Sequence, residues 1–275
     1  LVRMDTDVKG LKPILDDIER FTRTDNEHAL CEWQSITIND LVYHHTPNVE
    51  VFNNLSLTLK RGEKIALIGF SGGGKSTLLN IIRGLYVAKQ VNLIIDDVSF
   101  NTLEPLQTLT TLIPQDPEIF ENTVAFNITL DVPASTDEIE QAMRLSAFHK
   151  VLPRFPLGLA TDICEKGQNL SFGQKQRLAL ARGLFAARYS SIILMDEPTS
   201  SIDLPTETEI LTNVIQAFPN STLIVSLHRL HLLPKFDRII MLDHGKVLAD
   251  GPTQELLNQD GPVYKLWQSA NLVKA

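Results

Sequence analysis

A glycine-rich run at residues 69–77 carries the residue types of a phosphate-binding loop. It reads GFSGGGKST and has the spacing G-x-x-x-x-G-K-S. An apolar run, IALI, precedes it, and apolar residues at helical spacing follow it, namely Leu78, Leu79, Ile81, Ile82 and Leu85. The pattern predicts a strand, a loop and a helix in succession.

Such a loop binds phosphate through backbone geometry and charge. Glycines allow successive N–H groups to turn toward an anion, and the following helix directs its positive end at the same point. Lys75 would neutralise the outer phosphates, and the Ser76 hydroxyl would bind Mg²⁺. We therefore predict a nucleoside triphosphate site formed by Gly69, Ser71, Gly72, Gly73, Gly74, Lys75, Ser76 and Thr77.

Two carboxylates and a histidine follow apolar runs further along the chain. Asp196 and Glu197 end one run that is typical of a buried strand, and His228 follows another. Because ligands of open α/β sheets bind at the carboxyl edge, these side chains should meet there. Asp196 would hold Mg²⁺ from outside its ligand shell, Glu197 would orient or deprotonate the attacking water, and His228 would contact the γ-phosphate. An isolated Asp-Glu pair usually belongs to a solvated loop. Because a phosphate loop precedes this pair in the same chain, we favour a catalytic role for it.

The remaining pattern predicts the elements that position these residues. Apolar stretches on both sides of HHTPN predict a β-rich entry to the phosphate loop. Ser135 and Glu138 form a capping box inside a helical insertion at about residues 116–174, and a helix over residues 205–218 begins with proline. Further strands are predicted at residues 93–95, 112–113, 190–195, 223–225 and 239–242. This alternation predicts an α/β fold with a mainly parallel core sheet.

The composition narrows the classes of partner. The 275 residues carry a formal net charge of -8 and no Lys/Arg block, so the electrostatic footprint of a nucleic-acid-binding protein is absent. The two cysteines, Cys31 and Cys164, form neither a disulfide framework nor a metal-ligand cluster, which fits a reducing cytosolic setting. No apolar run approaches the ~20 residues that span a bilayer, so we expect this chain by itself to be soluble.

Five motifs follow one another in a characteristic order. After the phosphate loop come IPQDPEIF around Gln115, LSFGQKQR from Leu170, IILMDEPTSSID from Ile192 and SLHRL around His228. This order resembles the ATP-binding cassette, the nucleotide-binding domain of ABC transporters, over residues 36 to about 270. The resemblance implies an α/β P-loop NTPase (RecA-like) fold with a mainly parallel core, an N-terminal antiparallel β subdomain and the helical insertion.

The resemblance also implies a role for each matched motif. The glycine-rich loop would be Walker A with Lys75 as a catalytic residue, and Gln115 would be the Q-loop residue. Walker B would end at Asp196, followed by Glu197 as catalytic base, and His228 would be the switch histidine. The D-loop would contain Ser201 and Asp203. ATP and Mg²⁺ are the implied cofactors, and the implied metal-binding residues are Ser76, Gln115 and Asp196.

In this family, ATP is bound between two cassettes. The signature segment of one cassette, here Leu170, Ser171, Phe172, Gly173 and Gln174, closes over the γ-phosphate held by Walker A of the other. It opens a predicted helix that carries Leu178, Ala181 and Leu184, and a helix N-terminus can receive an anion. The implied assembly is an ATP-dependent homodimer or pseudo-dimer, because one chain alone would lack half of its site.

Two positions depart from the family pattern. Phe172 replaces the first glycine of LSGGQ. Because Ser171 and Gly173 remain, we expect a working signature, although a positive φ at residue 172 would be strained and would slow turnover. The family also stacks an aromatic residue on adenine. By register that place falls on His45, while Tyr43 lies two residues earlier on the same strand face. We favour Tyr43, because its ring is larger and uncharged, with His45 as the alternative.

Two stretches resemble exporter-type cassettes in particular. TDICEKG places Glu165 where the family contacts the coupling helix of its transmembrane partner, and residues 251–267 are similar to the ending of exporter cassettes. The implied function is ATP-driven export at the cytoplasmic face of a membrane, with a transmembrane domain as partner. The alternatives are an ABC ATPase outside transport and a nucleotide-gated clamp that hydrolyses ATP slowly.

Residues 1–30 differ in pattern from the rest of the chain. Val8, Leu11, Leu15 and Ile18 form one helical stripe before a polar segment, which predicts an amphipathic helix and a linker. This helix either packs on the domain or is a remnant that follows a transmembrane domain, since the chain begins at a leucine. The predicted division is a linker at 1–30 and a nucleotide-binding domain at 31–275.

Overall fold

The computed structural model describes residues 32–46, 48–116 and 118–272. The amphipathic helix predicted within residues 1–30 lies outside the described residues, and the domain boundary at residue 31 stays a prediction. Within the described part of the chain, no helix has the length and the hydropathy that a membrane span requires.

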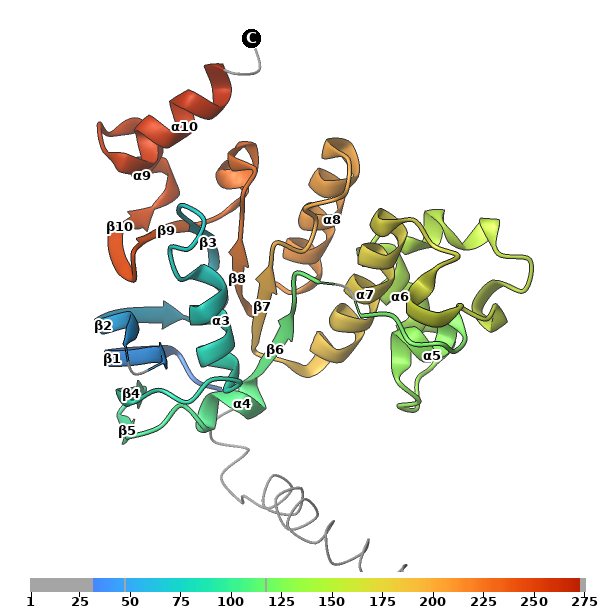
Figure 1. Cartoon of the computed structure of the whole chain (residues 1–275), viewed down its shortest axis with the longest axis horizontal. Helices are drawn as coiled ribbons and strands as arrows, with labels where there is room; N and C mark the ends of the chain where they lie inside the picture. The colour runs from blue at the N-terminus through green and yellow to red at the C-terminus, as the bar shows by residue number, and fades with distance from the viewer. Residues whose placement is uncertain (1–31, 47, 117, 273–275) are drawn as a thin grey trace, which may run out of the picture. The chain divides into compact units, whose positions relative to one another are not determined.

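A sheet of six strands forms the core (Figure 1). Its order is β10-β9-β3-β8-β7-β6, and neighbours are parallel except for the pair β9 and β10. The strands are β3 (Lys64–Ile68), β6 (Thr110–Ile113), β7 (Ile192–Asp196), β8 (Thr222–Ser226), β9 (Arg238–Asp243) and β10 (Lys246–Pro252). Every residue of β3, β7 and β8 is buried, as in parallel strands that are covered on both faces. The predicted mainly parallel core is confirmed.

A second, antiparallel sheet precedes and follows the phosphate loop in sequence. Its order is β2-β1-β4-β5, with β1 (Ser35–Thr46), β2 (Val49–Lys60), β4 (Gln90–Ile95) and β5 (Val98–Phe100). Ile36, Ile38 and Leu41 of β1 are fully buried, so one face of this sheet packs inward. The antiparallel subdomain is thus confirmed, and the strand predicted at residues 93–95 belongs to it.

Helices cover the core sheet and continue beyond its last strand. They are α3 (Lys75–Arg83), α4 (Pro105–Leu109), α8 (Leu204–Ala217), α9 (Thr253–Asn258) and α10 (Pro262–Leu272), with the 3₁₀ turns η5 (Ala187–Tyr189) and η6 (Leu230–Lys235). Gly84 ends α3 in the left-handed conformation, with φ 82. Leu85, which the spacing places on the same helical stripe, therefore lies outside the helix and is 61% exposed.

The helical insertion lies beside β6 (Figure 1). It contains α5 (Val124–Thr129), α6 (Thr136–Leu145), η1 (Phe148–Lys150), η2 (Leu152–Arg154), η3 (Gly158–Ala160), η4 (Glu165–Gly167) and α7 (Phe172–Ala186). The capping box of Ser135 and Glu138 at α6 is confirmed. α7 is buried on two sides, because Leu178 and Phe185 pack in the helical insertion while Leu180 and Leu184 pack in the core cluster.

The close approach of α7 to β6 generates a stability prediction. A Cβ at Gly183 would lie 2.5 Å from Cγ1 of Ile113. Gly183→Ala should lower the free energy of unfolding by about 1–2 kcal/mol in denaturant titrations, because an overpacking cost of about 1–3 kcal/mol exceeds a helix-propensity gain of about 1 kcal/mol. The control is Gly261→Ala, where the nearest atom to a Cβ is 3.8 Å away. A Gly183→Ala chain as stable as the parent would contradict the prediction.

Candidate nucleotide-binding site

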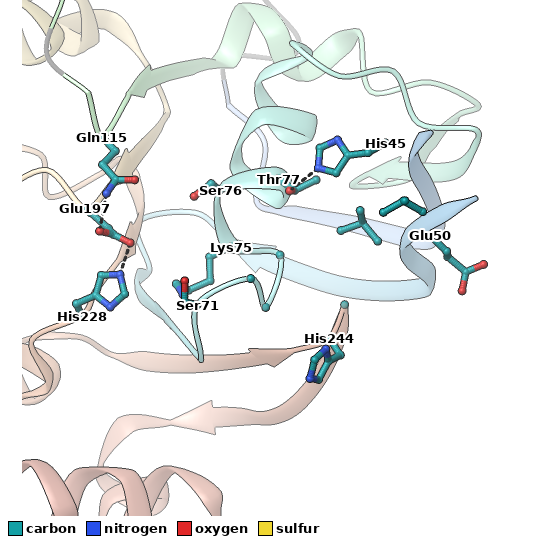
Figure 2. A pocket seen from close by; sticks show the side chains of 16 residues that line it. His45, Glu50, Ser71, Lys75, Ser76, Thr77, Gln115, Glu197, His228 and His244 are labelled. Atoms are coloured by element: carbon teal, nitrogen blue, oxygen red, sulfur yellow. Dashed lines mark hydrogen bonds and ion pairs between the residues drawn. The ribbon is translucent and has the colours of Figure 1, made fainter. Parts of the chain in front are cut away.

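A cleft of about 550 Å³ lies over the phosphate loop (Figure 2). It contains most of the predicted nucleotide-binding residues together with the predicted catalytic carboxylate and histidine. Its lining consists of His45, Val49, Glu50, Val51, Ser71, Gly72, Gly73, Gly74, Lys75, Ser76, Thr77, Gln115, Glu197, His228, His244 and Gly245. The structure therefore brings the separate motifs of the sequence to one place.

The phosphate loop connects β3 to α3 and depends on glycine at both ends. A Cβ at Gly69 would lie 1.9 Å from the carbonyl oxygen of Leu242, so no side chain fits where the loop passes β9. Gly74 has φ 101 and occupies the N-cap of α3, where no side-chain hydrogen bond caps the helix. The first N–H groups of α3 are therefore available for an anion.

The side chain of Lys75 folds back over the loop. Its Nζ donates hydrogen bonds to the carbonyl oxygens of Gly69 (2.9 Å) and Phe70 (3.1 Å). Burial lowers the pKa of Lys75, and the nearby carboxylates of Glu197 and Asp196 oppose that shift. A phosphate group would be a stronger partner for this ammonium than two neutral carbonyls, because charge-assisted hydrogen bonds are stronger.

Glu197 lies at the opposite end of the cleft from His45 (Figure 2). Nε2 of Gln115 donates to its Oε2 at 3.0 Å, and Nε2 of His228 contacts its Oε1. These three residues follow the neighbouring strands β6, β7 and β8, so the sheet edge assembles them as predicted. The backbone of Glu197 has φ 46, a left-handed conformation that is strained for a residue with a side chain and is common at functional sites.

Ser226 orients both residues of the Asp-Glu pair, although no motif indicates it. The parallel register places Ser226 opposite Asp196. Its Oγ donates to Oδ1 of Asp196 at 2.6 Å and accepts from the backbone N–H of Glu197 at 2.9 Å. Ser226 is fully buried. The available sequence signal is a hydroxyl at the end of an apolar strand, two residues before His228.

Ser76, Gln115 and Asp196 provide a donor set that fits Mg²⁺. Hydroxyl, amide and carboxylate oxygens are hard ligands, and Mg²⁺ commonly combines one or two carboxylates with substrate phosphates. Gln115 directs its amide nitrogen at Glu197, which turns its amide oxygen away from that carboxylate (Figure 2). In the described ranges, no group of three or more His, Cys, Asp or Glu residues could hold a metal.

The packing of the rings at the far end of the cleft favours His45 over Tyr43 as the residue that would stack on adenine. Tyr43 is 8% exposed, and its ring stacks on Tyr86 with centroids 5.5 Å apart, outside the lining of the cleft. His45 lines the cleft, with Nδ1 3.1 Å from the Tyr43 hydroxyl and Nε2 3.5 Å from Oγ1 of Thr77. The pairing of β1 with β2 is irregular at these residues, so the two rings do not occupy equivalent places.

The turn between β9 and β10 forms one wall of the cleft and was not expected from the motifs. His244 and Gly245 line the cleft. The N–H of Gly245 donates to the carbonyl of Gly73 at 3.3 Å, and a Cβ there would lie 1.7 Å from the carbonyl oxygen of Val51. The dipeptide His-Gly between two apolar strands is the sequence signal for this tight turn.

The backbone at Phe172 does not have the positive φ that would strain it. Phe172 begins α7 and does not have a positive φ, and its side chain is 52% exposed. Ser171 is the N-cap: its Oγ accepts from Gln174 N at 3.4 Å, while Oε1 of Gln174 accepts from Ser171 N at 2.9 Å. The condition for strain is therefore not met, because a helix starts at this residue and does not require a glycine.

Several predicted site residues lie outside the cleft of their own chain. The signature residues 170–174 do not line it, and neither do Ser201, Asp203 or Glu165. Asp203 is the N-cap of α8, and the hydrogen bond from the backbone N–H of Thr206 (3.0 Å) is the main cause that lowers the pKa of its carboxyl. Glu165 begins η4 and is exposed.

Comparison with known proteins gives the family. The model of the family "ABC transporter" matches residues 52–200, more than half of the chain. ABC transporter B family member 4 of Dictyostelium discoideum is 37% identical over 232 residues, which are 83% of this chain and 30% of that protein. The mitochondrial iron-sulfur clusters transporter ABCB7 of Oryzias latipes is 33% identical, over 86% of this chain and 32% of that protein.

A solved structure agrees with the sequence relatives. A bacterial Atm1-family ABC exporter with ATP bound superposes with a TM-score of 0.79 and 31% identity, over 86% of this chain and 42% of the exporter chain. This chain thus spans about a third of the length of the curated relatives described above. The cleft, the order of the motifs and the family match agree, and the chain belongs to the ABC transporter family.

Proposed function

We propose that this chain is the ATP-hydrolysing nucleotide-binding domain of an ABC exporter. The observation that carries the proposal is the position of Glu197, which faces the phosphate loop across one cleft and is held by Gln115 and His228. Family membership implies ATP binding. The carboxylate at the end of the cleft adds a base to the binding site.

Binding of the phosphates would use the loop and α3. Lys75 would exchange its two carbonyl partners for the β- and γ-phosphate oxygens, and the N–H groups at the start of α3 would donate to the same anion. Ser76, Gln115 and Asp196 would hold Mg²⁺, which neutralises charge on the phosphates. These groups account for binding but not for activation of water.

Hydrolysis would depend on Glu197 and His228. The Glu197 carboxylate would take a proton from water as the water oxygen attacks the γ-phosphorus and the bond to the ADP oxygen breaks. His228 Nε2, which contacts Glu197 in this structure, would donate to the γ-phosphate. The hydrogen bond from Glu197 N to Ser226 Oγ would hold the base in its strained conformation.

A second cassette would complete the site. The signature residues Ser171 and Gly173 lie outside the cleft of their own chain, at the start of a fifteen-residue helix. A helix of this length directs positive charge from its N-terminus. We therefore infer an ATP-dependent dimer in which each signature segment faces the γ-phosphate on the partner, with Ser201 and Asp203 at the contact.

Transport would require the part of the protein that this chain does not cover. The relatives include transporters three times as long and an exporter with ATP bound. We propose a transmembrane domain as partner, with exposed Glu165 at the contact with its coupling helix. The domain would then work at the cytoplasmic face of the membrane.

Stacking on adenine is assigned to His45. The proposal rests on its position in the cleft beside Thr77, while Tyr43 packs against Tyr86 behind it. The Tyr43 hydroxyl would orient the imidazole through Nδ1.

The roles of Lys75 and Glu197 give the first test. Glu197→Gln should keep ATP binding and lower phosphate release by about 10²–10⁴-fold, because it removes the general base. Lys75→Ala should weaken binding of a fluorescent ATP analogue. Glu255→Gln, an exposed position on α9, is the matched control and should leave both quantities unchanged. Wild-type phosphate release by Glu197→Gln would favour a nucleotide-gated clamp.

Ser226 gives the second test. Ser226→Ala removes the partner of both Asp196 Oδ1 and Glu197 N, so turnover should fall about 10–100-fold and stability by about 1–3 kcal/mol. Ser221→Ala, which loses a hydrogen bond to Ser190 O near the other end of β8, should lose stability without the loss of turnover. Equal turnover in the two variants would remove the proposed role of Ser226.

His45 and Tyr43 give the third test. His45→Ala should weaken ATP binding by about 5–100-fold, since stacking on a base contributes about 1–3 kcal/mol. Tyr43→Phe keeps the buried ring and should change affinity by less than His45→Ala. The measurement is an ATP titration at low chain concentration. The assignment is wrong if His45→Ala leaves the affinity for ATP unchanged.

A further inference from the structure

The loop that follows β7, residues 197–203, holds both the catalytic carboxylate and the D-loop residues. The side chain of Gln176 on α7 forms three hydrogen bonds with this loop. Nε2 of Gln176 lies 3.1 Å from Oγ of Ser200 and 3.4 Å from the carbonyl oxygen of Glu197, and its Oε1 accepts from the N–H of Ser201 at 3.0 Å. Gln176 is 3% exposed. The amide is therefore a buried group whose donor and acceptor atoms all face this loop.

Gln176 lies little more than one turn after the N-cap of the signature helix. Ser171 caps α7, and Gly173 packs so closely on the loop that a Cβ would lie 3.1 Å from the carbonyl oxygen of Ser201. Further along, Leu180 and Leu184 of α7 pack in the core cluster. The start of the signature helix and the loop after β7 are thus in direct contact through one amide and one glycine.

A separate set of contacts anchors the same loop to the core. Arg229 donates to the carbonyl oxygens of Ile202 (2.6 Å) and Ser200 (3.1 Å) and pairs with Glu207 at 2.8 Å. Glu207, 3% exposed, also accepts from Oγ1 of Thr199 at 2.7 Å. The loop therefore keeps its core-side anchors and its contact with Gly173 when Gln176 is changed, and loses the hydrogen bonds of the amide.

We propose that Gln176 is a positioning residue that ties the signature segment, which serves the partner's ATP, to the loop that carries the chain's own catalytic Glu197. This inference rests on the proposed dimeric ATPase. Movement of α7 onto the partner's phosphate would be transmitted through Gln176 to Ser200, Ser201 and the Glu197 carbonyl. Each chain would then align its own base when its signature segment closes over the ATP held by the other chain.

The chemistry of the side chain explains why an amide is needed. The loop offers one donor, the N–H of Ser201, and one carbonyl acceptor, that of Glu197, at the same place. An amide satisfies both, whereas a carboxylate can accept from Ser201 and Ser200 but would repel the Glu197 carbonyl. Methionine has a similar length but forms neither the hydrogen bond with the Ser201 N–H nor the one with the Glu197 carbonyl.

The experiment uses the 275-residue chain and compares Gln176→Met, Gln176→Glu and Gln254→Met, the last at an exposed position on α9. Turnover is measured as phosphate release at saturating ATP. Nucleotide affinity is measured with a non-hydrolysable ATP analogue at low chain concentration. ATP-driven dimerisation is measured by sedimentation in a Glu197→Gln background.

Gln176→Met should lower turnover about 10–100-fold and weaken dimerisation, because misplacement by about 1 Å can cost 10²-fold. The affinity of Gln176→Met for the ATP analogue should stay within twofold of that of the parent chain, since no residue that lines the cleft is substituted. Gln176→Glu should retain more turnover than Gln176→Met, and Gln254→Met should resemble the parent chain. In a chain that already carries Gln176→Met, the further change Ser200→Ala should have almost no effect on turnover, because the effects of substitutions at coupled residues are not additive.

Two results would overturn the inference. One is wild-type turnover by Gln176→Met while Lys75→Ala and Glu197→Gln are inactive. The other is a loss of analogue affinity that equals the loss of turnover, which would make Gln176 a support of the nucleotide cleft alone. If Gln176→Met does not fold, turnover and analogue affinity are measured in Gln176→Glu and Ser200→Ala instead. The same two results would then overturn the inference. Wild-type turnover by Lys75→Ala and Glu197→Gln would instead contradict the proposed function itself.

Discussion

The parallel pairing of β7 with β8 is the constraint on which the catalytic edge of this domain depends. It places Asp196 opposite Ser226, whose buried hydroxyl donates to the Asp196 carboxylate and accepts from the next backbone N–H. Two adjacent carboxylates would otherwise repel each other in a partly dry site. In the proposed site, Asp196 would serve the metal, while Glu197, which has a left-handed backbone, lines the cleft.

The same edge explains why the groups proposed to bind the phosphates and those proposed for catalysis come from different parts of the chain. The loop after β3 and the start of α3 supply groups for the phosphates, while the ends of β6, β7 and β8 supply Gln115, Glu197 and His228. The signature helix lies against the β7 loop and presents its N-terminus outside the cleft. In the proposed dimer, the binding energy of ATP therefore brings two chains together, and the loop after β7 connects the two halves of each site.

The sequence predicts the parts of this arrangement that depend on local pattern. Glycine spacing identifies the phosphate loop, and apolar runs that end in Asp196 and before His228 identify the edge of the sheet. The choice between Tyr43 and His45 depended on an irregular strand pairing and on packing by Tyr86, which spacing does not reveal. Ser226, Gly245 and Gln176 contact partners 21 or more residues away, so only the fold shows these contacts. At Phe172, the glycine pattern left open whether the backbone has a positive φ, and the fold shows that a helix begins there.

The most direct measurement of the central claim is the rate of ATP hydrolysis per chain as a function of chain concentration, with the association state followed by sedimentation under the same conditions. A site completed by a second chain predicts a rate per chain that rises with concentration and saturates when the dimer forms. A full rate per chain at concentrations where the chain is monomeric would contradict the account, because it would show that one chain contains the whole catalytic site.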